Sequence, residues 1–261
     1  MPSNQPKWPK DNRDFLRCYR YLSPAAGPDN EMLMPAENCQ PDAQTFHRRK
    51  SLTRVAHFAA DLPNDLVETL WQRPTALIAR GEPLRCMHVR QTVLVEWQSK
   101  KYVLKQYVEQ SRRHALKRTV QSSRASLTWK FTQRLADSGV ATPRPVACIE
   151  NRWGPLRRDS FLMYPYVEGR TLRSWLAGEA KNSPLMLNQF WQQLEELWLH
   201  LVRLRVSLAD TNLNNFIVCP AGQLWLIDLD KSRFHRLAFV AARQRARGWN
   251  QLLRSAAKCS K

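Results

Sequence analysis

The sequence predicts an α+β fold of two lobes, a small antiparallel sheet followed by a reduced helical lobe. Two observations support this. Runs rich in β-forming residues gather between residues 89 and 169, and apolar residues at helical spacing dominate after residue 170. The 261 residues suffice for two such lobes and an extension. Ten Trp, nine Phe and six Tyr can build a core, which excludes a chain disordered throughout.

The first part of the chain has the weakest pattern. Residues 1–50 are rich in Pro, Asn, Asp and Gln and show little periodicity, so we expect a poorly ordered extension there. The first lobe is expected over residues 51–168 and the second over residues 169–261. The role of residues 1–80 stays open.

The sheet lobe is expected to contain two pairs of strands around one helix. VRQTVLVEW (89–97) and KYVLKQY (101–107) are separated by three polar residues, which predicts a hairpin. Two further strands are expected at VACIE (146–150) and within DSFLMYPYVEG (159–169).

A long helix is expected between these two pairs. Arg124, Leu127, Phe131 and Leu135 recur at helical spacing within a basic stretch, and the pattern stops at Gly139, as helices commonly do.

The second lobe is expected to be mostly helical. TLRSWL (171–176) begins one helix, and FWQQLEELWLHLVRL (190–204) carries an apolar stripe along one face. A second hairpin joins NFIVC (215–219) to QLWLIDLD (223–230). The tail, residues 231–261, is helical in pattern.

The charge is strongly positive, with 41 Lys and Arg against 22 Asp and Glu and a net charge of +19. Such an excess favours an anionic partner, which can be nucleic acid, a nucleotide, a phosphorylated sugar or an anionic membrane surface. Residues 100–130 and the tail hold 17 of the 19 excess charges. This clustering favours a binding surface, and solvated helix faces are the alternative. Four apolar residues of the tail could lie at a membrane interface or pack onto the helical lobe: Leu237, Phe239, Val240 and Trp249.

The N-terminus and the cysteines indicate a reducing compartment. No apolar segment of a secretory signal is visible, and no run of apolar residues is long enough to span a membrane. None of the six cysteines forms a C-x-x-C pair, so we expect free thiols and no structural zinc site in a cytoplasmic protein.

Three chemical groups follow one another in a fixed order. Lys105 closes a predicted strand, Asp210 precedes Asn215 by five residues, and Asp228 ends an apolar strand. Phosphoryl transfer needs a cation on the α- and β-phosphates, oxygen ligands for Mg²⁺, and a carboxylate that takes the proton of the acceptor hydroxyl. This is the order of such groups in the protein-kinase-like fold. Each group alone also has a structural explanation. Lys105 could be a solvated surface lysine, and Asp210, Asn215 and Asp228 could simply be turn residues.

With these residues the chain resembles the bacterial lipopolysaccharide core kinases, which are the Kdo and heptose kinases. Three stretches within residues 85–240 carry the resemblance. They are residues 117–169 with their TPRP and GPLR turns, LADTNLNNFIV (208–218), which looks like the family's catalytic loop, and LIDLDKSRF (226–234), which looks like its metal loop. The resemblance implies a two-lobed protein-kinase-like fold, and an ATP-dependent kinase that phosphorylates a heptose or Kdo hydroxyl of the lipopolysaccharide inner core. It also implies a cytoplasmic protein, with peripheral contact at the inner membrane as an option, and no nucleic-acid partner.

The resemblance also assigns residues to roles. Asp210 would be the catalytic base, Asn215 and Asp228 the Mg²⁺ ligands, and Lys105 the ligand of the ATP phosphates. Asp230 is a lesser candidate beside the metal loop. The hinge that meets the adenine through its backbone would consist of Met163, Tyr164, Pro165, Tyr166 and Val167.

The chain departs from the kinase pattern at three places. No G-x-G-x-x-G precedes Lys105, so residues 87–93 or the turn at Gln98 would have to cover the phosphates. Leu208 stands where a His is usual. A Glu on the following helix usually pairs with the lysine, but the central helix, residues 122–135, contains no acid. Thr128-Trp129 occupies the place where some relatives carry Glu-Trp. A protein Ser/Thr kinase, a small-molecule kinase and an inactive, basic, kinase-like binding protein therefore stay open as alternatives.

Overall fold

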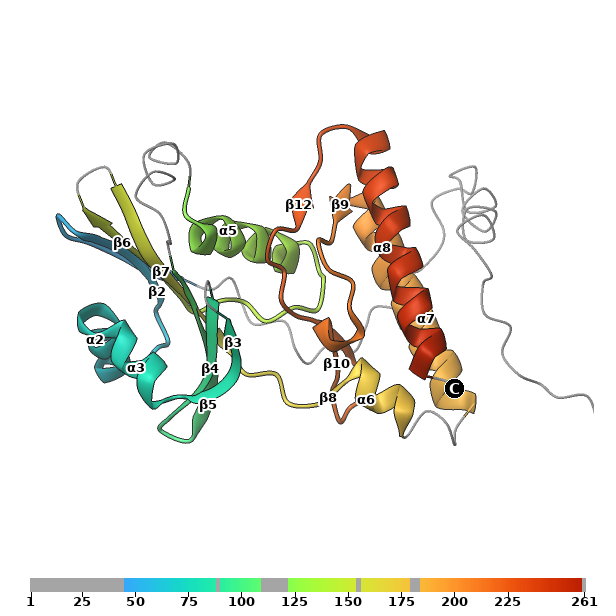
Figure 1. Cartoon of the computed structure of the whole chain (residues 1–261), viewed down its shortest axis with the longest axis horizontal. Helices are drawn as coiled ribbons and strands as arrows, with labels where there is room; N and C mark the ends of the chain where they lie inside the picture. The colour runs from blue at the N-terminus through green and yellow to red at the C-terminus, as the bar shows by residue number, and fades with distance from the viewer. Residues whose placement is uncertain (1–44, 88–89, 109–121, 154–155, 179–183, 260–261) are drawn as a thin grey trace, which may run out of the picture.

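The structure is a computed structural model that describes residues 45–87, 90–108, 122–153, 156–178 and 184–259 (Figure 1). An antiparallel sheet flanked by helices precedes a lobe built mainly of helices, which confirms the predicted α+β fold class. Among the described residues, none of the helices combines the length and the apolar character that a membrane crossing needs.

The first lobe is a seven-stranded sheet in which every neighbouring pair of strands is antiparallel. Its spatial order is β1-β2-β6-β7-β5-β4-β3. The strands are β1 (Phe46–Lys50), β2 (Arg54–Ala59), β3 (Glu82–Met87), β4 (Arg90–Trp97), β5 (Lys100–Tyr107), β6 (Ala147–Trp153) and β7 (Leu156–Pro165).

The predicted first hairpin is confirmed as β4 and β5. Its two turn residues, Gln98 and Ser99, have φ values of 48° and 63°. A two-residue turn with both residues in the left-handed region matches the twist of the flanking strands, which fixes the register of the pair.

Side chains alternate between the two faces of the sheet. Leu104 is fully buried on the face covered by helices α2 (Asn64–Gln72) and α3 (Pro74–Arg80). Tyr107 lies on the opposite face, in a cluster with residues of the long central helix. Lys105 is two residues from Tyr107, so it points to the same face and away from α2 and α3.

The central helix is confirmed as α5 (Arg124–Asp137). Ser123 caps it by accepting a hydrogen bond from the Ser126 amide at 3.0 Å, and the chain leaves it at Gly139 with φ at 84°. The expected stripe is wrong at Leu127, which is 56% exposed. The buried face keeps Phe131 and Leu135 of that stripe and adds Ala125, Thr128 and Thr132.

The second lobe has the helices α6 (Leu172–Ala177), α7 (Pro184–Arg203) and α8 (Ala238–Cys259), which correspond to the three predicted helical segments. Helices α7 and α8 lie side by side (Figure 1), and the rings of Trp198 and Trp249 meet between them at 4.9 Å. Short strands and one 3₁₀ helix complete the lobe: β8 (Arg170–Thr171), β9 (Val206–Ser207), η2 (Leu213–Asn215), β10 (Phe216–Val218), β11 (Leu224–Leu226) and β12 (Arg233–Phe234).

Three expectations need correction. Phe46–Lys50 form strand β1 and belong to the sheet, although they were expected in the extension; the rest of that extension lies outside the described residues. The strand expected over residues 223–230 ends at Leu226. Trp249 is fully buried, so packing onto the helical lobe is its role, and it cannot reach a membrane interface.

Candidate active site

A cavity of about 500 Å³ is lined by residues of both lobes. Strand β5 contributes Lys105, and the loops around β10 and β11 contribute Asp210, Asn215 and Asp228. The four residues that the sequence analysis selected for phosphoryl transfer therefore lie around a single cavity, although more than one hundred positions separate Lys105 from the others.

Lys105 and Asp228 form an ion pair across this cavity. The Lys105 ammonium lies 2.8 Å from Oδ1 of Asp228, and Lys105 is 7% exposed. Asp228 thus takes the place of the absent helix carboxylate as the partner of the lysine. Burial raises the pKa of Asp228, but Lys105, then Arg90 and Arg85, lower it more, and its net shift is downward. Asp228 is therefore ionised at neutral pH, as a metal ligand must be.

The backbone brings Asp228 next to Asn215. The Ile227 amide donates to the Asn215 carbonyl at 2.8 Å, which ties the metal loop to the catalytic loop. Asp228 itself has φ at 56°, in the left-handed region that non-glycine residues rarely adopt. Such a conformation persists where the surroundings enforce it, and it is common at functional sites.

Hydrogen bonds within the loop orient Asp210. Its Oδ1 accepts from the Asn212 amide at 3.1 Å, and its carbonyl accepts from Nδ2 of Asn215 at 3.2 Å. Asp210 is exposed, whereas Asn215 is buried. The carboxylate is therefore open to an acceptor that arrives from solvent, while the amide lies deeper in the cavity.

The residues around the cavity suit a hard cation such as Mg²⁺ that takes its remaining ligands from phosphate and water. Asp228 and Asn215 offer oxygen atoms, which Mg²⁺ prefers, and it usually takes only one or two carboxylates with phosphate oxygens and water. No group of three or more His, Cys, Asp or Glu residues forms a self-sufficient metal cage in the part of the chain that is described. The buried hydroxyl of Thr142, which lines the cavity, has no hydrogen-bond partner in the structure, so a polar ligand could satisfy it.

The expected hinge borders the cavity along four of its five residues: Tyr164, Pro165, Tyr166 and Val167. Met163 is fully buried in the core under α2 and α3 and is not part of the lining. The Tyr166 amide donates to the Lys101 carbonyl at 2.9 Å, so that amide already has a partner within the sheet lobe.

A family model, the Lipopolysaccharide kinase (Kdo/WaaP) family, matches residues 68–261. The chain belongs to this family. Two 3-deoxy-D-manno-octulosonic acid kinases, from Xylella fastidiosa strains M12 and 9a5c, are each 29% identical to it over 136 residues. These matches cover 52% of this chain and 51% of each relative, so the chain spans about half the length of the curated relatives it matches.

A solved structure of WaaP in complex with acyl carrier protein has the same fold. It superposes with a TM-score of 0.52 at 17% sequence identity and covers 77% of this chain and 99% of that chain. The protein-kinase-like fold expected from the resemblance is thereby confirmed.

Helix α8 supports the loop that contains Asp210. Leu208, which stands where kinases usually have His, is buried in the core of the second lobe. The Thr211 hydroxyl donates to the Gly248 carbonyl at 2.7 Å, and Nε2 of Gln251 donates to Oδ1 of Asp210 at 3.3 Å. A Cβ on Gly248 would lie 3.0 Å from the Thr211 side chain, so this close approach favours glycine. The sequence pattern does not reveal this support, for which Gly248 within a helical segment is the one visible signal.

The structure distinguishes the two candidates for the phosphate cover. Gln98 donates to Asp65 of α2 at 3.1 Å, on the sheet face away from Lys105. By contrast, Arg90 at the start of β4 contacts Asp228. Of the two candidates, residues 87–93 are the stretch that reaches the cavity, through Thr92; residues 88–89 lie outside the described residues.

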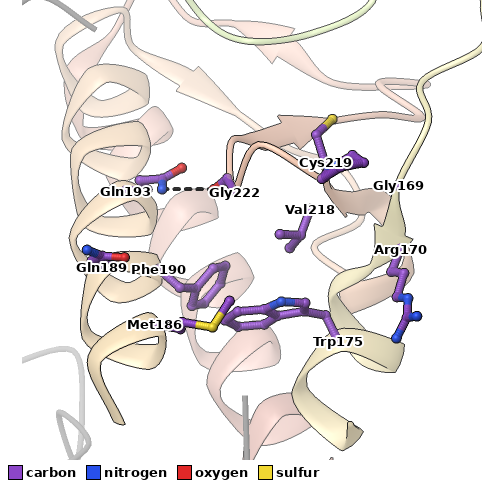
Figure 2. A pocket seen from close by; sticks show the side chains of 11 residues that line it. Gly169, Arg170, Trp175, Met186, Gln189, Phe190, Gln193, Val218, Cys219 and Gly222 are labelled. Carbon is purple, nitrogen blue, oxygen red and sulfur yellow. Dashed lines mark hydrogen bonds between the residues drawn. The ribbon is translucent and has the colours of Figure 1, made fainter. Parts of the chain in front are cut away.

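A second, smaller cavity of about 300 Å³ lies within the helical lobe. Figure 2 shows its aromatic wall, where the rings of Trp175 and Phe190 meet at 5.3 Å beside Met186. Gln193 closes one side by donating to the Gly222 carbonyl at 3.0 Å. This cavity contains none of the four phosphoryl-transfer residues.

Proposed function

We propose that this chain is an ATP-dependent kinase that phosphorylates a sugar hydroxyl of the lipopolysaccharide inner core. Kdo is the favoured acceptor, and heptose is the alternative. The convergence of Lys105, Asp210, Asn215 and Asp228 on one cavity is the observation that carries the proposal. Membership of the family and the names of the Kdo kinase relatives support the substrate class.

The proposed reaction assigns one task to each of these residues. The acceptor hydroxyl oxygen attacks the γ-phosphorus of ATP, the bond from that phosphorus to the β,γ-bridging oxygen breaks, and ADP leaves. Asp210 takes the proton of the hydroxyl. Lys105 holds the α- and β-phosphates, and Asn215 and Asp228 would hold Mg²⁺, whose charge offsets that of the phosphates.

The exposure of Asp210 suits a bulky acceptor. A glycolipid core can approach an exposed carboxylate, whereas the nucleotide would lie deeper, between Lys105 and Tyr164, which line the same cavity. The net charge of +19 favours such an anionic substrate.

We propose that the start of α8 makes a peripheral contact with the inner membrane from the cytoplasmic side. Leu237 and Phe239 are 57% and 70% exposed, and the exposed Arg233, Arg236 and Arg243 surround them in sequence. Apolar side chains next to cations favour the interface of an anionic membrane, where each cation contributes about 1 kcal/mol.

Vesicle binding tests this contact. Replacing Phe239 with Ser should weaken sedimentation of the full chain with vesicles that contain anionic lipid. Leu127→Ser is the matched control, because Leu127 is also exposed but lies on α5 of the other lobe. Equal loss in both variants, or no loss in either, would contradict the proposed contact.

We also propose that the two lobes meet at residues 168 and 169. Gly169 has φ at 149°, and a Cβ there would lie only 2.4 Å from the Val218 carbonyl oxygen. Only glycine fits this crossing into β8, which pairs with β10 of the second lobe.

The proposed function is tested in a bacterium that lacks its own Kdo kinase. Expression of this chain should add the mass of one phosphate group to Kdo in the extracted core, and expression of the Asp210→Ala variant should not. Phosphate on heptose would move the proposal to the alternative acceptor. No added phosphate from a folded, expressed wild-type chain would overturn it, as would phosphate found on protein alone.

A further inference from the structure

The β3–β4 hairpin contacts the predicted metal ligand through arginines. Nη1 and Nη2 of Arg90 lie 3.3 and 3.4 Å from the two carboxylate oxygens of Asp228. Arg85 of β3 lies 4.0 Å from the same carboxylate, with its side chain 55% exposed. A hairpin without glycines thus presents side-chain cations at the position where a glycine-rich loop would offer backbone amides.

Arg90 is anchored by a second carboxylate. Its Nη1 lies 2.6 Å from Oδ2 of Asp230, and the side chains of Arg90 and Asp230 are 15% and 9% exposed. The Tyr107 hydroxyl donates to the other oxygen of Asp230 at 2.6 Å. Burial, followed by the charge of Asp230, raises the pKa of Tyr107 well above its ordinary value, so the hydroxyl keeps its proton.

Strand register explains why these groups meet. Arg90 of β4 is paired with Tyr107 of β5, so both side chains leave the sheet on one side at the same level. Thr128 of α5 approaches Asp230 from the other direction, with 3.5 Å between its hydroxyl and Oδ1. Asp230 is therefore held by strands β4 and β5 and by the central helix.

The charges around Asp228 do not balance. Three cations, Lys105, Arg90 and Arg85, surround the two carboxylates of Asp228 and Asp230. Arginine stays charged at neutral pH, so these five groups carry one positive charge in excess. Lys105 and Arg85 line the cavity, and Arg90 adjoins it through its contact with Asp228.

We infer that Arg90 binds the phosphate chain of the nucleotide and that Asp230 is the positioning residue that holds it there. The inference rests on the proposed kinase function and extends it to two residues outside the expected motif roles. Arg90 keeps its contact with Asp230 and exchanges its contacts with Asp228 for phosphate oxygens. This releases Asp228 for a cation. A guanidinium presents several N–H donors in one plane, so it can serve both partners at once.

The test compares the affinities of the purified full chain for ATP, ADP and AMP by calorimetry with Mg²⁺ present. The main variant carries Arg90→Gln and Asp230→Asn together, because Arg90→Gln alone would leave a buried, unpaired carboxylate. We expect ATP affinity to fall about 10- to 100-fold, as for a lost hydrogen bond to a charged group, with AMP affinity unchanged. The single variant Asp230→Asn should lower ATP affinity by a smaller factor and should also leave AMP affinity unchanged.

Each outcome has one meaning. Arg49→Gln is the matched control, since Arg49 forms an exposed ion pair with Glu68 near α2, and it should bind all three nucleotides as the wild type does. An unchanged ratio of ATP to AMP affinity in the double variant overturns the inference, and so does a parallel loss for all three nucleotides, which indicates a structural role. A wild-type chain that binds no adenine nucleotide would instead overturn the proposed function.

Discussion

The two sides of the interlobe cavity are built differently. The sheet side presents the cations Lys105, from strand β5, and Arg85, from strand β3, and the paired strands set their positions. The helical side presents oxygen atoms of Asp210, Asn215 and Asp228 from loops. Strand register needs no further support, whereas the loops are tied to α8 and to each other by hydrogen bonds. Cations are thus placed by the sheet, and the proposed metal ligands and the proposed base by anchored loops.

The second cavity sharpens this difference. Its walls come from the helical lobe, and Figure 2 shows the rings of Trp175 and Phe190 along one of them. It lacks the opposed cations and carboxylates of the interlobe cavity, so the chemistry depends on the meeting of the two lobes.

The largest expected effect is on the loop side. Asp210→Ala should lower kcat about 10²- to 10⁴-fold, because the acceptor hydroxyl loses its base. ATP affinity should persist, since Asp210 is not a proposed phosphate ligand. Steady-state kinetics and calorimetry measure both quantities. Glu96→Ala, which removes an exposed carboxylate of β4, is the control. A full loss of nucleotide binding in Asp210→Ala would show that the loop side and the sheet side do not have separate roles in catalysis and nucleotide binding.

The next effect is on the sheet side. Lys105→Met should weaken ATP binding about 10- to 100-fold, because a charged donor to the phosphates is lost. The chain should still fold, since Asp228 keeps Arg90 as a partner. Unchanged ATP affinity in a folded variant would remove Lys105 from the nucleotide site.

A smaller effect is expected from loosening the anchor of the loop. Thr211→Val removes the hydrogen bond to Gly248, worth about 1 kcal/mol, and should lower kcat about fivefold without changing ATP affinity. Ser138→Ala is the control, because its hydroxyl bonds only the end of α5 at the surface. If the two variants have the same kcat, α8 does not support the loop.

The smallest effect concerns pH. The pKa of Asp228 is lower in the folded chain, so its ion pairs stabilise the fold above the ordinary pKa of Asp. This contribution is lost as the pH falls from that value through the lowered one. Wild type should therefore unfold more steeply with acid than Asp228→Asn, as measured by denaturant titration at each pH. Parallel acid profiles would mean that the pairing with Lys105 and Arg90 adds no stability.

The sequence predicted the loop side better than the sheet side. Asp210, Asn215 and Asp228 lie within 19 residues, so local spacing reveals them. Arg90 and Asp230 are 140 positions apart, and only strand pairing brings them together. Strand β1 could not be predicted either, because nearly all of its sequence FHRRK is exposed and shows no alternation of apolar and polar residues. Leu127 fits a helical stripe in sequence, but which face of a helix is buried depends on its neighbours.

Transfer of phosphate to a defined sugar tests the central proposal most directly. The purified chain is incubated with ATP, Mg²⁺ and inner-core acceptors that end in Kdo or in heptose, and the products are analysed by mass spectrometry. We expect ADP and phosphorylated Kdo in equal amounts, and neither with Asp210→Ala. ADP without a phosphorylated sugar, or equal transfer by Asp210→Ala, would contradict the proposed mechanism.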